Sequence, residues 1–479
     1  MSKTNTAVKQ QVPLGQKIAF GFGMLANQMF PASVGVFIIV LVQDLGFAAL
    51  LWGIIQFAPR IFDAITDPIM GFISDNTRSK WGRRRHYVFI GSIIMGIAFS
   101  FMWQLYKVDG LDYNFWYFMI WSLIFYLGLT IFSVPFVAMG YEISDDFHER
   151  TQIMAVSQFI GQFAWVIAPW FWVILYNPEW FPDGAASGVR ELSVWVAIPC
   201  SLFAMIPALF LKSKSTLDRK DFLPITPAYV GKSVLNIFTS ALEAFKIKQF
   251  KKIAFATFLI FNSFNIIASF TFLIIVHYMF NSDPASAGSW TAIHGSVGAI
   301  FTSFLVIPII NWMAKTYGKK KAFIIAQSIS IVGYILFWFL FVPGKPYLFI
   351  YALPFHSFGI GSLFTIMMSM TADICDLDEL NTGKRREGVL GAVYWWMVKF
   401  GFGIAALLSG SILWYVGFDA ESVTESAITG MRIFYSLLPI AGVVGAILIM
   451  KDYDLTEEKS KEISEQLVIM RKKKENKNV

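Results

Sequence analysis

Long apolar runs are the feature that most constrains how this 479-residue chain can fold. Segmented at roughly 17–25 residues, the length of helix that crosses a bilayer, the sequence gives about twelve runs. Only 15% of the residues are charged, whereas a soluble domain has about 25%. An all-α integral membrane protein is therefore predicted. The expected spans lie near 18–42, 48–74, 87–106, 114–139, 153–176, 192–212, 252–280, 289–313, 322–343, 347–372, 389–416 and 429–450.

Basic residues between the spans predict the orientation. Lys3, Lys9 and Lys17 precede the first span, and a basic cluster from Arg78 to Arg85 follows the second. By the positive-inside rule both termini face the cytoplasm, and the expected location is the bacterial inner membrane. Basic loops beside an anionic leaflet explain the net charge of +7. Membrane lipid is therefore an expected partner, nucleic acid is not, and a monomer is expected.

The longest connection divides the spans six and six. We predict an N-terminal six-helix bundle over 1–212, a cytoplasmic middle loop over 213–251, a C-terminal six-helix bundle over 252–451 and a cytoplasmic tail over 452–479. The middle loop contains "SVLNIFTSALEAF", in which apolar residues recur near helical spacing. Such a segment suits a helix lying in the membrane surface.

The loops of the two halves resemble each other. "DNTRSKWGRRR" follows the second span and "AKTYGKKK" follows the eighth, while "YEISDDFHERT" follows the fourth span and "DICDLDELNTGKRRE" follows the tenth. Similar loops at matching places indicate an internal duplication, which is typical of secondary transporters. A channel or a receptor has no comparable reason to repeat these loops.

Two acids lie inside the second span. Asp63 and Asp67 are four residues apart, so a helix places them on one face. A carboxylate at the bilayer centre costs at least roughly 2.5–3.5 kcal/mol, and this pair is tolerable if a cation lies between the two or a proton is shared. Thr66 is adjacent, and Pro68 leaves the Ala64 carbonyl without its helical donor. These oxygens predict a site for a hard cation such as Na⁺.

Other charges in or near this span have alternative interpretations. Arg60 could form a structural ion pair with one of the acids. Asp75 and Arg78 lie where the span meets the cytoplasm, where ion pairs could form in one conformation and break in the other. We expect these two to act as a gate, whereas plain anchoring at the membrane surface explains most of the neighbouring arginines.

Lys399, in "YWWMVKFGFG" of the eleventh span, is a basic charge in the second half. Apolar residues flank it for a full turn on either side, which makes snorkelling to the interface difficult. One interpretation couples it electrostatically to Asp63 and Asp67. The alternatives are a purely structural partner for an acid of the first half, or a lysine at the end of its helix.

Neutral hydrogen-bonding residues and aromatic rings inside the spans predict a sugar cavity. Amide and hydroxyl groups can meet sugar hydroxyls while flat rings cover the apolar face of the sugar. Taken one at a time, the aromatic residues are equally compatible with packing or with facing lipid. The candidate residues are Asn27, Gln28, Ser133, Gln158, Gln162, Phe364, Tyr394 and Trp395, together with Lys399.

Four segments carry a resemblance to a known family: "DAITDPIMGFISDNTRSKWGRRR", "VPFVAMGYEIS", "DLDELNTGKRREG" and "YWWMVK". In combination they resemble the glycoside–pentoside–hexuronide:cation symporters, the melibiose-carrier branch of the major facilitator superfamily. The likeness covers nearly the whole chain. It implies twelve helices in two six-helix bundles, with sugar and cation crossing together by alternating access. No cofactor is implied beyond Na⁺ or H⁺ as the coupling ion.

The resemblance also implies roles for individual residues of the cation site. The paired acids of the family fall on Asp63 and Asp67, a family asparagine on Thr66 and a family threonine on Thr130. The basic residue of the eleventh span falls on Lys399. The cation site of the family is thus nearly complete in this chain.

The sugar site departs from the family pattern. A lysine–aspartate pair is replaced by Asn27 and Gln28, an aspartate by Ser133 and an arginine by Gln158, and a stacking tryptophan falls on Phe364. These replacements keep hydrogen-bonding ability and lose charge. A glycoside, an oligosaccharide or a uronate therefore stays open as the substrate, whereas melibiose itself is not implied.

The sequence as a whole predicts a symporter that couples inward movement of a cation, Na⁺ in preference to H⁺, to sugar uptake. A cation-coupled carrier of lysolipid or another amphiphile is an alternative, which the polar residues Asn27, Gln28 and Gln158 disfavour. A non-transporting sugar sensor is a second alternative. An enzyme is not expected, because the chain has no HExxH motif, and Cys200 and Cys375 lack metal-ligand spacing.

Overall fold

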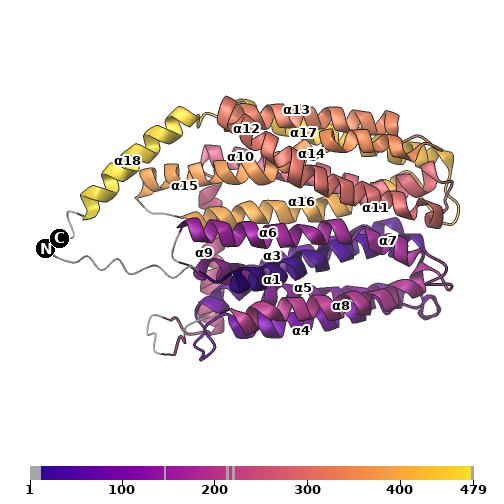
Figure 1. Ribbon diagram of the computed structural model, residues 1–479, viewed down its shortest axis with the longest axis horizontal. Helices are drawn as coiled ribbons and strands as arrows, with labels where there is room; N and C mark the ends of the chain where they lie inside the picture. Colours follow the sequence, from indigo (N-terminus) through magenta and orange to yellow (C-terminus); the bar gives the residue numbers. More distant parts are fainter. Residues whose placement is uncertain (1–11, 145–146, 212–214, 218–221, 384–385, 476–479) are drawn as a thin grey trace.

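The structure, a computed structural model, describes residues 12–144, 147–211, 215–217, 222–383 and 386–475. Long helices run side by side in a single bundle (Figure 1). Within the described residues, eleven helical stretches are long and apolar enough to cross a membrane. The 27-residue helix α3, Ala49–Asp75, is equally long but carries four charged residues. With α3 included, the described residues contain twelve candidate spans, the number expected from the sequence.

Helices α1 to α8 form the N-terminal half, drawn in indigo to magenta in Figure 1. Most spans are single helices, but the first and the fifth each combine two. Their bounds are α1 Leu14–Phe37, α2 Ile39–Gln43, α3 Ala49–Asp75, α4 Arg85–Met102, α5 Leu111–Glu142, α6 Phe147–Ile167, α7 Trp170–Leu175 and α8 Ala185–Phe210, with a short 3₁₀ turn at Lys107–Asp109.

Helices α10 to α17 form the C-terminal half. Three of its spans contain a π-helical segment: Ile274–Met279 ends the span of α10, Phe301–Val306 joins α11 to α12, and Leu363–Met367 joins α14 to α15. The helix bounds are α10 Lys248–Leu273, α11 Pro284–Ile300, α12 Ile307–Tyr317, α13 Lys319–Leu340, α14 Leu353–Ser362, α15 Met368–Thr382, α16 Glu387–Tyr415 and α17 Glu425–Lys451, with a 3₁₀ segment at Pro346–Ala352.

The two halves pack together near one end of the bundle. We call the end where α1 begins the Leu14 end, and the opposite end, just beyond α2, the Asp44 end. Near the Asp44 end one apolar core contains residues of both halves, and the rings of Trp172 and Phe272 lie 3.6 Å apart between centroids. A second apolar core, toward the Leu14 end, is built from residues of the C-terminal half, the middle segment and the tail. The structure therefore joins its halves near the Asp44 end.

Ion pairs at the Leu14 end repeat between the halves. In the N-terminal half, the Arg84 Nη1 at the start of α4 lies 2.7 Å from the Glu142 Oε1 at the end of α5. In the C-terminal half, the Lys319 Nζ at the start of α13 lies 2.6 Å from the Asp373 Oδ2 of α15. The loops that resemble each other in sequence thus make equivalent contacts, as an internal duplication requires.

The middle segment and the tail each contain a helix. Helix α9, Pro227–Ala244, contacts α3 of one half and α16 of the other, and it leaves Leu235 and Leu242 exposed. Helix α18, Glu457–Glu475, extends from the bundle at the Leu14 end (Figure 1). Its first part packs against α15 and buries Ile463 and Leu467, so the tail is anchored to the C-terminal half.

Candidate functional site

The closest helix pair between the two halves is formed by α3 and α16 around two glycines. A Cβ atom on Gly410 would lie 2.5 Å from the Ala49 carbonyl oxygen and 2.8 Å from the Gly53 Cα. Farther along the pair, a Cβ on Gly403 would lie 3.1 Å from the Phe57 ring. Because glycine has no side chain, the two backbones can approach closely. This approach brings the middle of α16 against the acidic part of α3.

At that point Lys399 of α16 lies between Asp63 and Asp67 of α3. The Lys399 Nζ is 2.7 Å from the Asp63 Oδ2 and also contacts the Asp67 Oδ2. Thr130 of α5 donates to the Asp63 Oδ1 at 2.8 Å or to the Asp67 Oδ1 at 3.0 Å, and its hydroxyl is 3.2 Å from that of Thr66. One ammonium, two carboxylates and two hydroxyls thus form a single cluster across the halves.

The ligands of this cluster suit a small hard cation or a proton. Carboxylate and hydroxyl oxygens are the ligands that hard cations prefer. In the described part of the chain, no group of three or more His, Cys, Asp or Glu side chains gathers as a transition-metal site would require. The Lys399 ammonium contacts both carboxylates, so an entering cation would compete with it for the same oxygens.

Arg60 lies one turn from Asp63 on α3 and is not its partner. The guanidinium carbon is 5.0 Å from the ring centroid of Tyr126 and 5.3 Å from that of Phe402. Among the described residues, no carboxylate lies within ion-pair distance of Arg60. Asp63 and Asp67 both pair with Lys399 instead.

Asp75 and Arg78, the expected gate, make separate contacts. Asp75 pairs with Arg84 at the start of α4. The Arg78 guanidinium lies over the ring of Phe222 in the middle segment, 5.7 Å from its centroid. The structure thus places the contact of Asp75 inside the N-terminal half, and a gating role for either residue stays a prediction.

Polar residues of α1 and α6 form a hydrogen-bonded group. Gln28 donates to the Gln158 Oε1 at 3.0 Å, and the Trp165 indole donates to the Gln28 Oε1 at 3.0 Å. Trp165 was not among the candidates from the sequence. The sequence did contain a signal for Trp165. Positions 158, 162 and 165 are spaced by four and three, so Gln158, Gln162 and Trp165 share one face of the helix.

The polar group and the acids occupy a similar depth in the bundle. At roughly 1.5 Å per residue, Gln28, Gln158 and Asp63 lie about 20–25 Å from the Asp44 ends of their spans. Asn27 lies beside Gln28 and donates a long contact to the Met24 Sδ of its own helix, at 4.0 Å. Ser133 lies one turn from Thr130 on α5.

The aromatic candidates separate into two environments. Phe364 and Trp395 are 40% and 44% exposed, and Phe364 packs edge-on against Phe261. Tyr394 is only 2% exposed, and its hydroxyl donates to the Leu363 carbonyl at 3.4 Å. The structure therefore places Tyr394 in the core of the C-terminal half and does not bring it together with Gln28 and Gln158.

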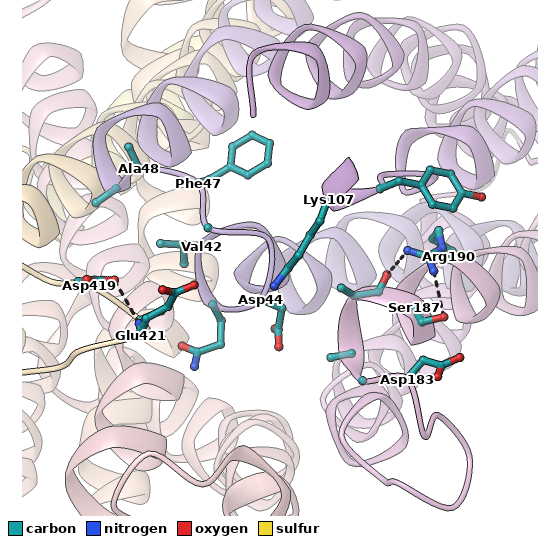
Figure 2. Close-up of a pocket in the computed structure, with 18 of the residues that line it drawn as sticks. Val42, Asp44, Phe47, Ala48, Lys107, Asp183, Ser187, Arg190, Asp419 and Glu421 are labelled. Carbon is teal, nitrogen blue, oxygen red and sulfur yellow. Dashed lines mark hydrogen bonds between the residues drawn. The ribbon is translucent and has the colours of Figure 1, made fainter. Parts of the chain in front are cut away.

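A cavity of about 950 Å³ opens at the Asp44 end, between the N-terminal half and the loop after α16 (Figure 2). Two of its lining residues, Gln43 and Phe418, also contact His277. The Gln43 Oε1 lies 3.0 Å from the His277 Nε2, and the Phe418 and His277 rings meet edge-on at 5.4 Å. We call Gln43 and His277 the latch, because their hydrogen bond joins the two halves beneath the cavity.

Asp44 lies just beyond the first span, in the wall of the same cavity. The Tyr176 hydroxyl donates to its carboxylate, and the Lys107 side chain extends toward it (Figure 2). Burial raises the pKa of the Asp44 carboxyl to about 6, while the Tyr176 hydrogen bond and the charge of Lys107 partly oppose that rise.

Comparison with known proteins gives full-length matches. A family model described as "MFS/sugar transport protein" matches residues 19–457. The glucuronide carrier protein homolog of Escherichia coli (strain K12) is 24% identical, over 95% of this chain and 96% of the relative. The isoprimeverose transporter of Lactiplantibacillus pentosus is 22% identical, over 91% and 87% of the two chains.

Solved structures show the same fold at low sequence identity. The nucleoside transporter NupG aligns with a TM-score of 0.62 at 16% identity, over 93% of this chain and 100% of that one. The xylose transporter XylE from E. coli, in a partially occluded inward open conformation, aligns with a TM-score of 0.60 at 15% identity, over 92% and 99%. The two-half, twelve-span arrangement is therefore the major facilitator fold.

Proposed function

The chain belongs to the MFS/sugar transport protein family, and on that premise we propose that it is a symporter that couples entry of a cation to uptake of a sugar. Family membership makes it a multi-pass membrane transporter and not an enzyme, and the resemblance stated from the sequence is confirmed. We propose Na⁺ as the coupling ion in preference to H⁺, and a glycoside, an oligosaccharide or a uronate as the sugar.

The contact of Lys399 with Asp63 and Asp67 is the observation that carries this proposal. Two adjacent carboxylates inside the bundle need a counter-charge, and Lys399 of the other half supplies it in this conformation. A coupling cation would bind the same carboxylates, with the hydroxyls of Thr130 and Thr66 as further oxygen ligands. Cation binding would then release Lys399, so occupancy of the site and the contact between the halves become linked.

The group formed by Gln28, Gln158 and Trp165 is our proposed sugar site. Its amide and indole groups suit the hydroxyls of a sugar, and it lies at the depth of the acids. Phe364 and Trp395 offer exposed ring faces in the other half. The names of the relatives, a glucuronide carrier homolog and an isoprimeverose transporter, support a glycoside as the substrate class.

The arrangement of the halves supports an inward-open conformation. With both termini in the cytoplasm, as the basic loops favour, the packed Asp44 end is the outer end. The cavity in Figure 2 would then be an outer vestibule with the latch at its base. Sugar and cation would enter when the latch opens and leave toward the Leu14 end when the halves rock back.

Transport by the purified full-length protein in proteoliposomes tests this proposal. We suggest p-nitrophenyl glucuronide, isoprimeverose and melibiose as probes, with inward gradients of Na⁺, H⁺ or K⁺. We expect accumulation of at least one sugar with a Na⁺ gradient and little accumulation with K⁺. The proposal would be overturned if no sugar accumulated with any gradient, and binding of a sugar without flux would identify a sensor instead.

A further inference from the structure

Helix α11 of the C-terminal half packs against the break between α6 and α7 of the N-terminal half. Two residues, Ala168 and Pro169, separate α6 from α7. A Cβ atom on Gly295 of α11 would lie 2.7 Å from the Pro169 Cγ, so the glycine permits this close approach. We call this contact the second crossing of the halves, the first being that of α3 and α16.

Ser296, the next residue of α11, donates a hydrogen bond across the second crossing. Its Oγ lies 2.6 Å from the Val166 carbonyl oxygen in the last turn of α6, and the serine is only 4% exposed. Carbonyls in the last turn of a helix lack intrahelical donors, and Pro169 has no N–H to offer them. The Ser296 hydroxyl therefore satisfies a backbone group of the other half.

The same turn of α6 contains a residue of the proposed sugar site. Trp165 directly precedes Val166, and its indole donates to the Gln28 Oε1 at 3.0 Å. A sugar hydroxyl that accepts this hydrogen bond in place of Gln28 would shift the tryptophan. Since few backbone hydrogen bonds hold a helix end that is followed by a proline, the adjoining Val166 carbonyl can shift with it.

Each proposed ligand site thus adjoins one crossing of the halves. At the first crossing, Lys399 of α16 contacts Asp63 and Asp67 of α3. At the second crossing, Ser296 of α11 bonds to α6 beside Trp165. A change at either ligand site can therefore reach a contact between the halves within one or two residues.

We propose that Ser296 is a positioning residue that links occupancy of the sugar site to the contact between the halves. This inference rests on the proposed function and adds a residue of the C-terminal half that touches no sugar itself. Without sugar, the Ser296 hydrogen bond stabilises the conformation that is closed at the Asp44 end. Sugar bound at Trp165 weakens that hydrogen bond, so the Asp44 end opens more often.

The variant Gly288→Cys reports opening of the Asp44 end. A Cβ atom on Gly288 of α11 would lie 3.6 Å from the Val173 Cα of α7, an ordinary contact distance, so the side chain fits the closed conformation. Its rate of reaction with a membrane-impermeant maleimide is measured on the full-length protein in right-side-out vesicles. The same chain without Gly288→Cys gives the background from Cys200 and Cys375, which are both buried.

Ser296→Ala removes one oxygen atom and is combined with the reporter. Without sugar, we expect it to raise the reaction rate by about fivefold, as loss of one hydrogen bond predicts. With isoprimeverose or p-nitrophenyl glucuronide, whichever the wild-type protein transports, the rate of the reporter alone should rise, and Ser296→Ala should abolish that rise. Thr302→Val is the control, because the Thr302 hydroxyl bonds within its own span, to the Gly298 carbonyl at 2.8 Å.

Two results would overturn the inference and leave the proposed function intact. One is an equal sugar-free rate for Ser296→Ala and Thr302→Val, which would show that the hydrogen bond does not hold the Asp44 end closed. The other is a sugar-induced rise that persists in Ser296→Ala, which would separate Ser296 from the sugar site. A wild-type protein that transports no sugar of the panel would instead overturn the proposed function and the link to sugar together.

Discussion

Lys399 and Asp63 lie in different halves of the bundle, and the Lys399 Nζ is 2.7 Å from the Asp63 Oδ2. This contact depends on the close approach of α3 and α16 around Gly53 and Gly410. If the helices separated there, Asp63 and Asp67 would lose their counter-charge, which is costly for carboxylates inside a bundle. In the mechanism that we propose, the coupling cation takes over that charge, so cation binding and the contact between the two helices are linked.

The first prediction concerns Asp67→Asn. This substitution removes one of the two carboxylates that would bind the cation, so we expect uptake driven by a Na⁺ gradient to be abolished. Counterflow of sugar should persist, because the sugar site retains its residues. Asp112→Asn, an acid in the first turn of α5, serves as the control and should accumulate sugar normally. Normal accumulation by the Asp67→Asn protein would show that the cation site is assigned wrongly.

The second prediction concerns Lys399→Gln. Removal of the ammonium leaves two carboxylates that repel each other, so a cation is bound more tightly. We expect the apparent affinity for Na⁺, measured by titration of sugar binding, to rise about tenfold or more. The stability without Na⁺ should fall, because uncompensated charges stay buried. Lys315→Gln, on the exposed side of α12, should change neither quantity. An unchanged Na⁺ affinity in Lys399→Gln would rule out competition between the lysine and Na⁺ for the two carboxylates.

The twelve spans and the paired acids could be predicted because each depends only on run length or residue spacing within a single segment. Run length gives the spans, and a spacing of four places Asp63 and Asp67 on one helix face. Lys399 could be linked to these acids only because its positive charge can compensate theirs, since nothing within its own segment identifies a partner. The structure adds the contact and the glycines that permit it.

Features that depend on how helices meet were not predictable. Tyr394 and Trp395 are neighbours in sequence, but successive residues of a helix point about 100° apart, so one is buried and the other is 44% exposed. His277 had no partner in the sequence because Gln43 is 234 residues away. The latch therefore follows from tertiary packing alone.

The third prediction concerns Gly410→Ala. Its Cβ would meet the backbone of α3 at 2.5 Å, and backbone cannot move aside as the end of a side chain can. We expect destabilisation by about 1–3 kcal/mol and impaired coupling, measured by thermal unfolding and by Na⁺-driven uptake. Gly391→Ala on the same helix is the control, since nothing lies within 4 Å of its added Cβ. That variant should be neutral or up to about 1 kcal/mol more stable. Equal stability of the two variants would contradict the close approach.

The fourth prediction is a pH dependence caused by Asp44. Burial raises the pKa of its carboxyl from the ordinary value of 3.8 to about 6 in the folded protein. Between these two values the folded state binds more protons than the unfolded state does, so stability falls as the pH rises from about 4 to about 6. A shift of about two pKa units corresponds to about 3 kcal/mol at most.

Asp44→Asn should remove this loss of stability with rising pH, because an amide does not ionise. We expect the midpoint of thermal unfolding of this variant to depend less on pH between about 4 and 6 than that of the wild-type protein, and to be the higher of the two at pH 7. Asp183→Asn, an exposed residue in the wall of the same cavity, should retain the wild-type pH dependence. If Asp44→Asn and Asp183→Asn gave the same pH profile as the wild-type protein, Asp44 would not be the residue responsible.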